Sequence, residues 1–261
     1  MRSIRLDIKA YLRRIDYRGS LEPTAEVLRD LQVAHLLAVP FENLSIHAGE
    51  PIVLEDEALF EKIVVRRRGG FCYEANGLFA ALLRAIGFDV KMLAAGVARA
   101  DGSFGPEFDH MALAVTLAER WLVDVGFGDS FVEPLRLDER GAQVQPDGRA
   151  YRIAPDGDEH LILLRRVADV AEWEPQYRFT LRPYAYADYE EMCRYHQTSP
   201  ESHFTRGRIC SRATPAGRVT LSEMRLIETQ AGGERTERLL SNEEEYEAAL
   251  REHFRIDALR F

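Results

Sequence analysis

Cys72 is the residue whose place in the sequence best suits covalent chemistry. It follows Gly69 and Gly70, which permit a tight backbone turn, and it precedes an apolar pattern with helical spacing. A thiol at the start of a helix faces unpaired backbone N–H groups and the positive end of the helix dipole, and both favour the thiolate. We therefore expect a lowered pKa for Cys72 and a role as a nucleophile, with N–H groups able to stabilise an oxyanion. The alternative is a buried, inert cysteine, which is the commoner kind.

A cysteine nucleophile needs a histidine to take its proton and a third group to orient that histidine. Among the seven histidines, His110 is the best candidate, because it follows a turn-rich segment and directly precedes an apolar strand pattern. Asp124 closes the next predicted strand, where a carboxylate among apolar residues needs a partner. On these grounds Asp109 and Asp129 remain alternatives to Asp124.

The separation of His110 and Asp124 depends on the hairpin between them. With a loop at 118–120, Gly128 faces His110 across the hairpin and Asp124 faces Ala114. The resulting offset is about 13 Å at the rise of a β-strand. We therefore expect a regular hairpin to bring the two side chains into one neighbourhood without direct contact, and the sequence shows no bend that would close the gap.

The elements that must position these residues change in kind along the chain. Helical periodicity prevails up to about residue 90 and is clearest over 79–86, where Gly87 stands at the position of a C-cap glycine. The last third mixes patterns, and we expect a helix over 184–197, one or two strands over 218–229 and an acidic helix over 242–254. Between these parts, short apolar or alternating runs indicate a sheet or barrel. These runs are 92–97, 111–117, 120–125, 151–153, 160–166 and 177–181.

Composition limits the class of protein. The 261 residues contain 34 Lys and Arg against 43 Asp and Glu, and the net charge of −9 argues against nucleic acid as a partner. Cys72, Cys193 and Cys210 are far apart, so we predict neither a disulfide framework nor a cysteine-rich metal site. The charged amino terminus and the lack of a long apolar run predict a cytoplasmic protein without a membrane anchor.

Several motifs occur in an order typical of one family. They are residues 39–44, residues 68–76, His110, residues 124–128 and residues 199–204. In these motifs, which together span residues 39–204, the chain strongly resembles the arylamine N-acetyltransferases. The resemblance implies a catalytic triad of Cys72, His110 and Asp124, and it selects Asp124 because that residue is the aspartate of the family's Asp-Val-Gly-Phe-Gly motif.

The resemblance also implies a fold. An α+β architecture similar to that of cysteine proteases is expected, in three parts. A helical bundle over residues 1–89 would carry Cys72, a β-barrel over 90–195 would carry the histidine and the aspartate, and an α/β lid would occupy 196–261.

The implied reaction is a ping-pong acyl transfer of the kind used in xenobiotic metabolism. Acetyl-CoA, a substrate and not a permanently bound cofactor, acetylates Cys72, and the acetyl group then passes to an arylamine, an arylhydrazine or the oxygen of an N-hydroxyarylamine. His110 would deprotonate the thiol or hold an ion pair with it and later assist the amine, while Asp124 fixes the imidazole tautomer. The partners expected are these small molecules, with the chain as a monomer or homodimer.

Other positions acquire expected roles through the same resemblance. Phe41, Phe127 and Phe204 match positions that line the acceptor and CoA cleft, where flat rings suit an aryl substrate. Gly126 and Gly128, with Phe127 and Phe204, are the expected CoA contacts, since glycine allows a close backbone approach.

Two features depart from the simple picture. Asp109 stands where many relatives have a hydroxyl or small residue before the histidine, and its charge is expected to raise the pKa of His110. An acidic protein must also supply local positive charge for the CoA phosphates, and Arg206, Arg208 and Arg212 are the candidates.

The remaining charged residues have structural interpretations. Residues 66–68, all arginines, are expected to form ion pairs with Glu42 and Glu74 around the cysteine loop. The other histidines are interpreted as surface or packing residues. They are His35, His47, His160, His196, His203 and His253.

Three other functions stay open. One is an amide synthase of the same fold that closes a macrolactam from a tethered polyketide. Another is a cysteine hydrolase or transglutaminase, which would react at a comparable rate without an amine acceptor. The non-enzymatic alternative is a ligand-binding module that keeps the fold without the chemistry.

Overall fold

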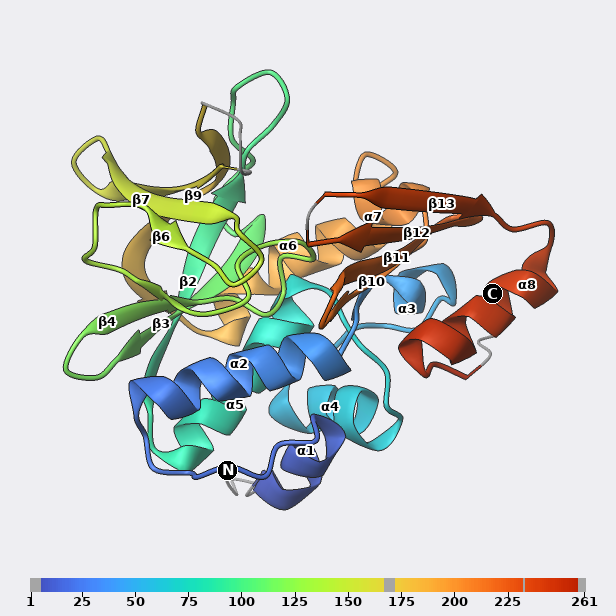
Figure 1. Ribbon diagram of the computed structural model, residues 1–261, viewed down its shortest axis with the longest axis horizontal. Helices are drawn as coiled ribbons and strands as arrows, with labels where there is room; N and C mark the ends of the chain where they lie inside the picture. Colours follow the sequence, from blue (N-terminus) through green and yellow to red (C-terminus); the bar gives the residue numbers. More distant parts are fainter. Residues whose placement is uncertain (1–5, 167–171, 232, 258–261) are drawn as a thin grey trace.

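Most helices of the first ninety residues form the lower layer of the molecule in Figure 1, whereas α3 lies beside the smaller sheet. They are α1 (Ile8–Arg14), α2 (Ala25–Ala38), α3 (Leu44–His47), α4 (Asp56–Phe60), η1 (Glu61–Val65) and α5 (Cys72–Ile86). The computed structural model describes residues 6–166, 172–231 and 233–257. Residues 1–5 and 258–261, at the outer ends of the first and last predicted parts, lie outside the described residues.

Helix α5 is the central element of this layer. Its residues are buried from Cys72 to Leu83, and it packs against two strands of the larger sheet. A carboxylate oxygen of Glu74 accepts a hydrogen bond of 3.1 Å from the backbone N–H of Phe71 and so satisfies a donor at the helix start. Gly87 ends the helix at φ +115°, which confirms it as the C-cap glycine.

The larger sheet is antiparallel and nearly closes into a barrel (Figure 1). In spatial order it consists of β5 (Leu135–Arg136), β4 (Arg120–Val123), β3 (His110–Thr116), β2 (Asp89–Val97), β9 (Glu174–Tyr184), β8 (His160–Arg166), β7 (Ala150–Asp156) and β6 (Gln143–Val144). The side-chain amide of Gln143 joins the two edge strands, because it bonds both the N–H and the carbonyl of Arg136 at 2.8 and 3.0 Å. The barrel predicted from the short apolar runs is therefore confirmed, with a core of its own around Tyr151, Tyr177 and Phe179.

The hairpin of β3 and β4 differs from its predicted register. Thr116 pairs with Arg120 and Leu113 with Val123, so the loop is one residue earlier than expected, at 117–119. Continued by one residue, this register places Asp124 opposite Ala112 instead of Ala114. The expected offset from His110 is thereby halved, and the prediction that the two side chains do not touch is wrong.

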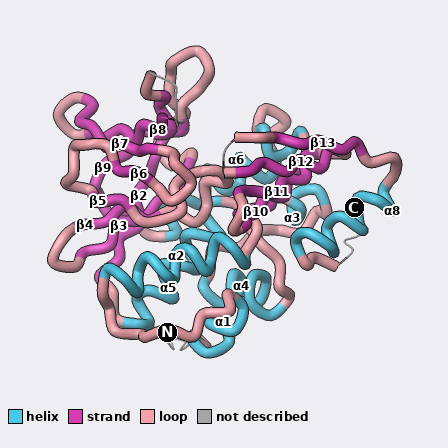
Figure 2. The backbone as a smooth tube through the Cα atoms, in the orientation of Figure 1, coloured by secondary structure: helices cyan, strands magenta, loops and turns pink. Residues whose placement is uncertain are grey.

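A second, smaller sheet stands beside the barrel (Figure 2). Its strands are β1 (Phe41–Glu42), β10 (Ile209–Thr214), β11 (Gly217–Ser222), β12 (Arg225–Gln230) and β13 (Arg235–Leu239). The helices α6 (Tyr186–Thr198) and α7 (His203–Arg206) connect the barrel to it, and α8 (Glu243–Ala249) with η2 (Leu250–Phe254) packs on it. These elements confirm the helices predicted over 184–197 and 242–254 and the strands predicted over 218–229.

The smaller sheet begins with residues from the helical part of the chain. Phe41 pairs with Ser211 of β10 and also forms a parallel bridge with Gly70, just before Cys72. The division into parts at residues 89 and 195 stays a prediction, and residue 195 lies within α6. No helix of residues 6–166, 172–231 or 233–257 is long and apolar enough to cross a bilayer.

Candidate active site

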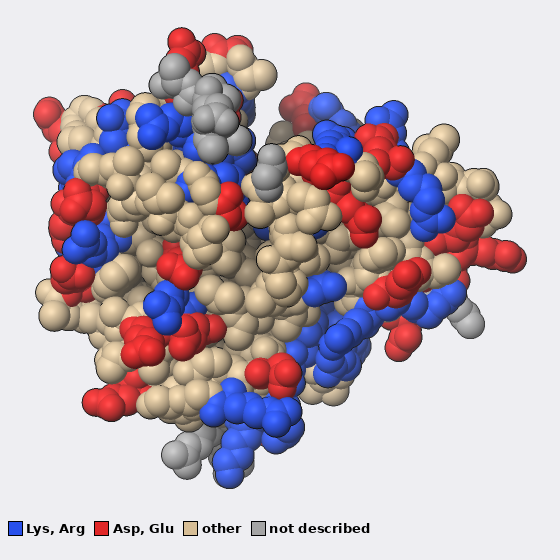
Figure 3. Space-filling view, in the orientation of Figure 1, with Lys and Arg blue, Asp and Glu red and all other residues tan. Residues whose placement is uncertain are grey.

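Cys72 lies at the inner end of a cavity between the barrel and the smaller sheet. The cavity has a volume of about 450 Å³, and the surface is hollowed between these two parts on the face drawn in Figure 3. Cys72 is the first residue of α5 and only 3% exposed. His110, at the start of β3, lines the same cavity. The candidate nucleophile and the candidate base thus meet at one site.

His110 is bonded directly to Asp124. The Nε2 atom of the imidazole lies 2.7 Å from Oδ2 of the carboxylate, and both side chains are almost fully buried. The other oxygen of Asp124 accepts a hydrogen bond of 2.9 Å from the backbone N–H of Gly126. A buried carboxylate with these partners is satisfied, and it fixes the orientation of the imidazole ring.

Two buried amides hold this pair, and sequence reasoning gave neither a role. Asn76 donates to Oδ1 of Asp124 at 2.9 Å and to the carbonyl of Met111 at 2.6 Å, while its own oxygen accepts from the N–H of Val125. Gln32 of α2 accepts from the N–H of Asp124 at 3.4 Å. The signal for Asn76 was available, because a residue four positions after Cys72 lies on the same face of a helix.

The thiol of Cys72 does not have the lowered pKa that its helix position suggested. Burial raises the pKa well above its ordinary value, and the charges of Asp109 and Asp124 raise it further, while the backbone N–H of Met111 opposes them. Desolvation is the largest of these effects. A proton acceptor such as His110 must take the thiol proton during the reaction for the sulfur to become nucleophilic.

The expected cleft residues all line the cavity. They are Phe41, Gly126, Phe127, Gly128 and Phe204. Positions 126 and 128 require glycine for different reasons. A Cβ at Gly126 would stand 2.8 Å from Cys72 Cα, so glycine at this position allows the chain to approach the nucleophile's backbone. Gly128 adopts φ +91°, in the left-handed region that favours glycine.

The two other candidate acids have different partners. Asp129 lines the cavity but forms ion pairs with Arg149, Arg165 and Arg218, at 2.7, 3.7 and 3.2 Å. Asp109 also lines the cavity, and its Oδ1 lies 3.3 Å from Nε2 of His196. The acid that hydrogen-bonds to His110 is Asp124, as the family resemblance implied.

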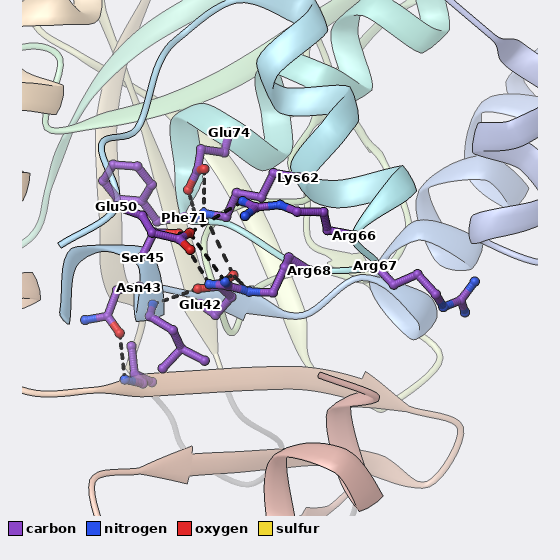
Figure 4. A network of polar contacts seen from close by, with 12 residues as sticks. Glu42, Asn43, Ser45, Glu50, Lys62, Arg66, Arg67, Arg68, Phe71 and Glu74 are labelled. Atoms are coloured by element: carbon purple, nitrogen blue, oxygen red, sulfur yellow. Dashed lines mark hydrogen bonds and ion pairs between the residues drawn. The ribbon is translucent and has the colours of Figure 1, made fainter. Parts of the chain in front are cut away.

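A buried network of charges supports the loop before Cys72 (Figure 4). Arg68 pairs with Glu42 at 2.9 Å, as predicted, whereas Glu74 pairs with Lys62 at 2.6 Å and not with an arginine. Lys62 also lies 3.8 Å from Glu42 and links the two pairs. Burial opposes ionisation of Glu42, but Lys62 and Arg68 outweigh it and hold its pKa below the ordinary value. Burial raises the pKa of Glu74 despite Lys62.

The arginines suggested for the CoA phosphates do not line the cavity. Arg206 donates to the carbonyls of Pro200 and Glu201, and Arg212 donates to those of Leu37 and His253. The nitrogens of Arg208 lie 2.8 and 2.9 Å from the carboxylate of Glu243. The cavity is lined instead by Arg218 and Arg235, on strands β11 and β13.

His203 is an exposed residue that packs on a neighbouring ring, as predicted, but it also has a place in the cavity. His203 lines the cavity, and its ring lies on that of Phe204 with centroids 3.9 Å apart. Burial lowers its pKa, and His196 adds to this effect. The signal that could have found it is its place directly before Phe204 in a motif already assigned to the cleft. His35, by contrast, is a packing residue as predicted, since it is fully buried and bonded to the hydroxyl of Tyr11.

Comparisons with known proteins identify similar chains. A family model described as N-acetyltransferase matches residues 24–260. An arylamine N-acetyltransferase of Mycolicibacterium smegmatis is 38% identical over 87% of this chain and 84% of its own length. An arylamine N-acetyltransferase / N-hydroxyarylamine O-acetyltransferase of Salmonella typhimurium is 35% identical over 86% of this chain and 80% of its own.

Solved structures agree with these sequence matches. The arylamine N-acetyltransferase of Mycobacterium marinum, determined in complex with CoA, has a TM-score of 0.88 and 37% identity. The match covers 96% of this chain and 93% of that one. The three-part α+β fold expected from the sequence is therefore confirmed.

Proposed function

The chain belongs to the arylamine N-acetyltransferase family, and from this premise we propose that Cys72, His110 and Asp124 carry out its acetyl transfer. The protein is an acyltransferase that moves an acetyl group from acetyl-CoA to arylamines. The observation that carries the assignment is the 2.7 Å bond between His110 and Asp124 beside a cavity that Cys72 also lines.

In the first half-reaction Cys72 attacks the thioester carbonyl of acetyl-CoA. Since Asp124 occupies Nε2 of His110, the Nδ1 atom is the nitrogen that takes the thiol proton. The sulfur adds to the carbonyl carbon, and backbone N–H groups at the start of α5 stabilise the oxyanion. The bond to the CoA sulfur then breaks, CoA leaves with the proton from His110, and Cys72 carries the acetyl group.

In the second half-reaction a neutral aromatic amine attacks the acetylated Cys72. Nδ1 of His110 removes a proton from the attacking nitrogen, the carbon–sulfur bond breaks, and the thiol of Cys72 regains a proton. Asp124 stabilises the imidazolium that forms in each half-reaction. Arylhydrazines, and N-hydroxyarylamines through their oxygen, are acceptors of the same mechanism.

The walls of the cavity supply the proposed contacts. Phe41, Phe127 and Phe204 form apolar walls for the aromatic acceptor, and Gly126 and Gly128 contact the donor. For the phosphates of CoA, Arg218 and Arg235 are the cations that line the cavity. The proposed partners are these small molecules alone, without nucleic acid or membrane, and the proposed state is a monomer or homodimer.

The test is acetylation of the protein by acetyl-CoA in the absence of an acceptor. We expect intact-mass spectrometry to show one acetyl group, located on Cys72 by peptide mapping and lost in Cys72→Ala. The matched controls Cys193→Ala and Cys210→Ala replace the other buried thiols and retain the adduct. An adduct on Cys193 or Cys210, or none at all, would contradict the proposal. Addition of an aniline must then discharge the adduct faster than water does, which separates a transferase from a hydrolase.

A further inference from the structure

A second pair of acid and histidine opens on the same cavity. Asp109, the residue before His110, has its Oδ1 atom 3.3 Å from Nε2 of His196 on helix α6. The side chain of His196 is 3% exposed, whereas that of Asp109 is 18% exposed and lines the cavity. Of the two groups, the carboxylate is therefore the one that a bound molecule can reach.

His196 is held in place by contacts at both nitrogens of its ring. Its Nδ1 lies 3.1 Å from Oγ of Ser202, and that oxygen already accepts the backbone N–H of Phe204 at 3.2 Å. The ring is also stacked on Tyr73 with centroids 6.1 Å apart. These contacts fix the position of His196 beside the carboxylate of Asp109.

The carboxylate of Asp109 fits closely against its own loop. A Cβ at Gly105 would stand 2.1 Å from Oδ2 of Asp109, so only glycine at position 105 leaves room for it. Burial opposes ionisation of Asp109, but the hydrogen bond and charge of His196, with a hydrogen bond from the N–H of Val97, hold its pKa below the ordinary value.

The carboxylate charge of Asp109 is not neutralised by neighbouring arginines as that of Asp129 is. Asp129 has three arginine partners, whereas no lysine or arginine in the described ranges forms an ion pair with Asp109. The titratable groups that face Asp109 from the surrounding elements are histidines, a thiol and a phenol. They are His110 on β3, His196 on α6, His203 on α7, and Cys72 and Tyr73 on α5. Asp109 is therefore a carboxylate in the cavity wall without a lysine or arginine partner among the described residues, and its charge acts on the Cys72 thiol.

We propose that Asp109, positioned by His196 and Ser202, determines acceptor specificity by charge. It favours aromatic amines that carry a second, cationic group and disfavours those that carry an anion. The reacting nitrogen itself is neutral, so the selection acts on the substituent. A charge in a partly enclosed cavity acts more strongly than it would in open water. This inference rests on the proposed function, because it concerns the acceptor of the same acetylated Cys72.

The test uses three para-substituted anilines of similar size. Para-aminobenzylamine carries an ammonium, para-ethylaniline is neutral, and para-aminophenylacetate carries a carboxylate. We expect kcat/KM of the wild-type enzyme to be highest for the ammonium and lowest for the carboxylate. In Asp109→Asn the ratio between these two acceptors should fall by at least about tenfold, as expected for the loss of one nearby charge, while the neutral acceptor changes least.

The matched control is Glu107→Gln, which removes an exposed carboxylate of the same loop. Glu107 bonds the hydroxyl of Tyr184 and does not line the cavity. The control must keep the wild-type ratio. A ratio that is unchanged in Asp109→Asn, or that falls equally in Glu107→Gln, would overturn the inference. If the asparagine variant does not fold, Asp109→Ser removes the same charge and must lower the ratio in the same way.

Acetylation of Cys72 by acetyl-CoA alone separates the two proposals. If wild-type protein is not acetylated on Cys72, the proposed function fails. If Cys72 is acetylated and discharged equally by all three anilines, only the role of Asp109 fails.

Discussion

The backbone of Gly126 lies directly against that of Cys72. A Cβ at position 126 would stand 2.8 Å from Cys72 Cα and 2.9 Å from the carbonyl oxygen of Cys72. The segment that follows β4 is thus packed onto the first turn of α5 without room for one methyl group. This contact sets the position of Asp124 relative to the nucleophile, since Asp124 is two residues before Gly126 and bonds its N–H.

Gly126→Ala should separate the two segments. The atoms in the way belong to the backbone of Cys72 and the buried amide of Asn76, which cannot rotate aside. We expect a loss of about 1–3 kcal/mol in the free energy of unfolding from overpacking, and a fall of about 100-fold in kcat/KM from misplacement of the site. Urea titration measures the free energy of unfolding, and steady-state kinetics measure kcat/KM. In the control Gly141→Ala the nearest atom belongs to the exposed side chain of Glu139, so both quantities should stay near wild type. Normal activity in Gly126→Ala would contradict the proposed tight fit.

Asn76→Ala should affect both the orientation of Asp124 and the stability of the protein. It removes the donor to Asp124 and to the carbonyl of Met111 and leaves both acceptors buried. We expect unfolding to become easier by about 2–4 kcal/mol, and kcat to fall by about 100-fold because Asp124 can rotate away from His110. Asn242→Ala is the control, because it removes only the cap of α8 and should lower stability without lowering kcat. If both variants keep full kcat, Asn76 does not position the aspartate.

Lys62→Met tests the buried charge network. The side chains of Glu42 and Glu74 are 0% and 1% exposed, and the substitution removes the 2.6 Å partner of Glu74. Breaking a buried pair in this way costs about 3–5 kcal/mol near neutral pH. Arg66→Met removes a partner of the partly exposed Glu50 and should cost less than about 1 kcal/mol.

The pH dependence of Lys62→Met follows from the signs of the shifts. In the wild type the lowered pKa of Glu42 contributes stability that is present above the ordinary value of 4.5 and is lost as the pH falls through the folded-state value. Without Lys62, the raised folded-state pKa of Glu74 rises further and the pKa of Glu42 is held down less, so the variant loses more stability than the wild type as the pH rises above 4.5. The difference in the free energy of unfolding between the wild type and Lys62→Met, measured by urea titration, should therefore be smaller at pH 5 than at pH 7. A difference that stays constant over this range would count against the network.

Asp109→Asn should make the Cys72 thiol more acidic. Burial is the main cause of its raised pKa, and Asp109 is the first of the charges that add to it. Removing this charge should move the pH profile of alkylation by iodoacetamide to lower pH by about one unit. Peptide mass spectrometry follows Cys72 separately from Cys193 and Cys210, whose profiles should not move. Glu107→Gln should leave the Cys72 profile in place, and an equal shift in both variants would contradict the assignment.

The sequence predicted best those features that depend on local order. The helix that begins at Cys72 followed from apolar spacing and from Gly87, both within one segment. The contact of His110 with Asp124 did not follow, because a shift of the loop by one residue moves every pairing of the hairpin.

Contacts between distant segments were beyond the same reasoning. His196 meets Asp109 only because α6 packs against α5 and against Phe108, next to Asp109, and no periodicity marks that meeting. The two-residue strand β1 is too short to leave a pattern, and its pairing with β10 depends on residues from the other end of the chain. The acidity of Cys72 was misjudged because burial, which raises the pKa of the thiol, is a property of the whole fold and not of the local sequence.

The pairing of β1 with β10 has a consequence for the order of events during synthesis. Phe41 is held between Gly70, next to the nucleophile, and Ser211, which the ribosome adds some 140 residues later. The wall of the cavity formed by Phe41 and Phe204 is therefore incomplete until most of the chain has emerged. A nascent chain that already contains Cys72 and His110 therefore lacks the part of the cavity wall that depends on Phe204 and Ser211.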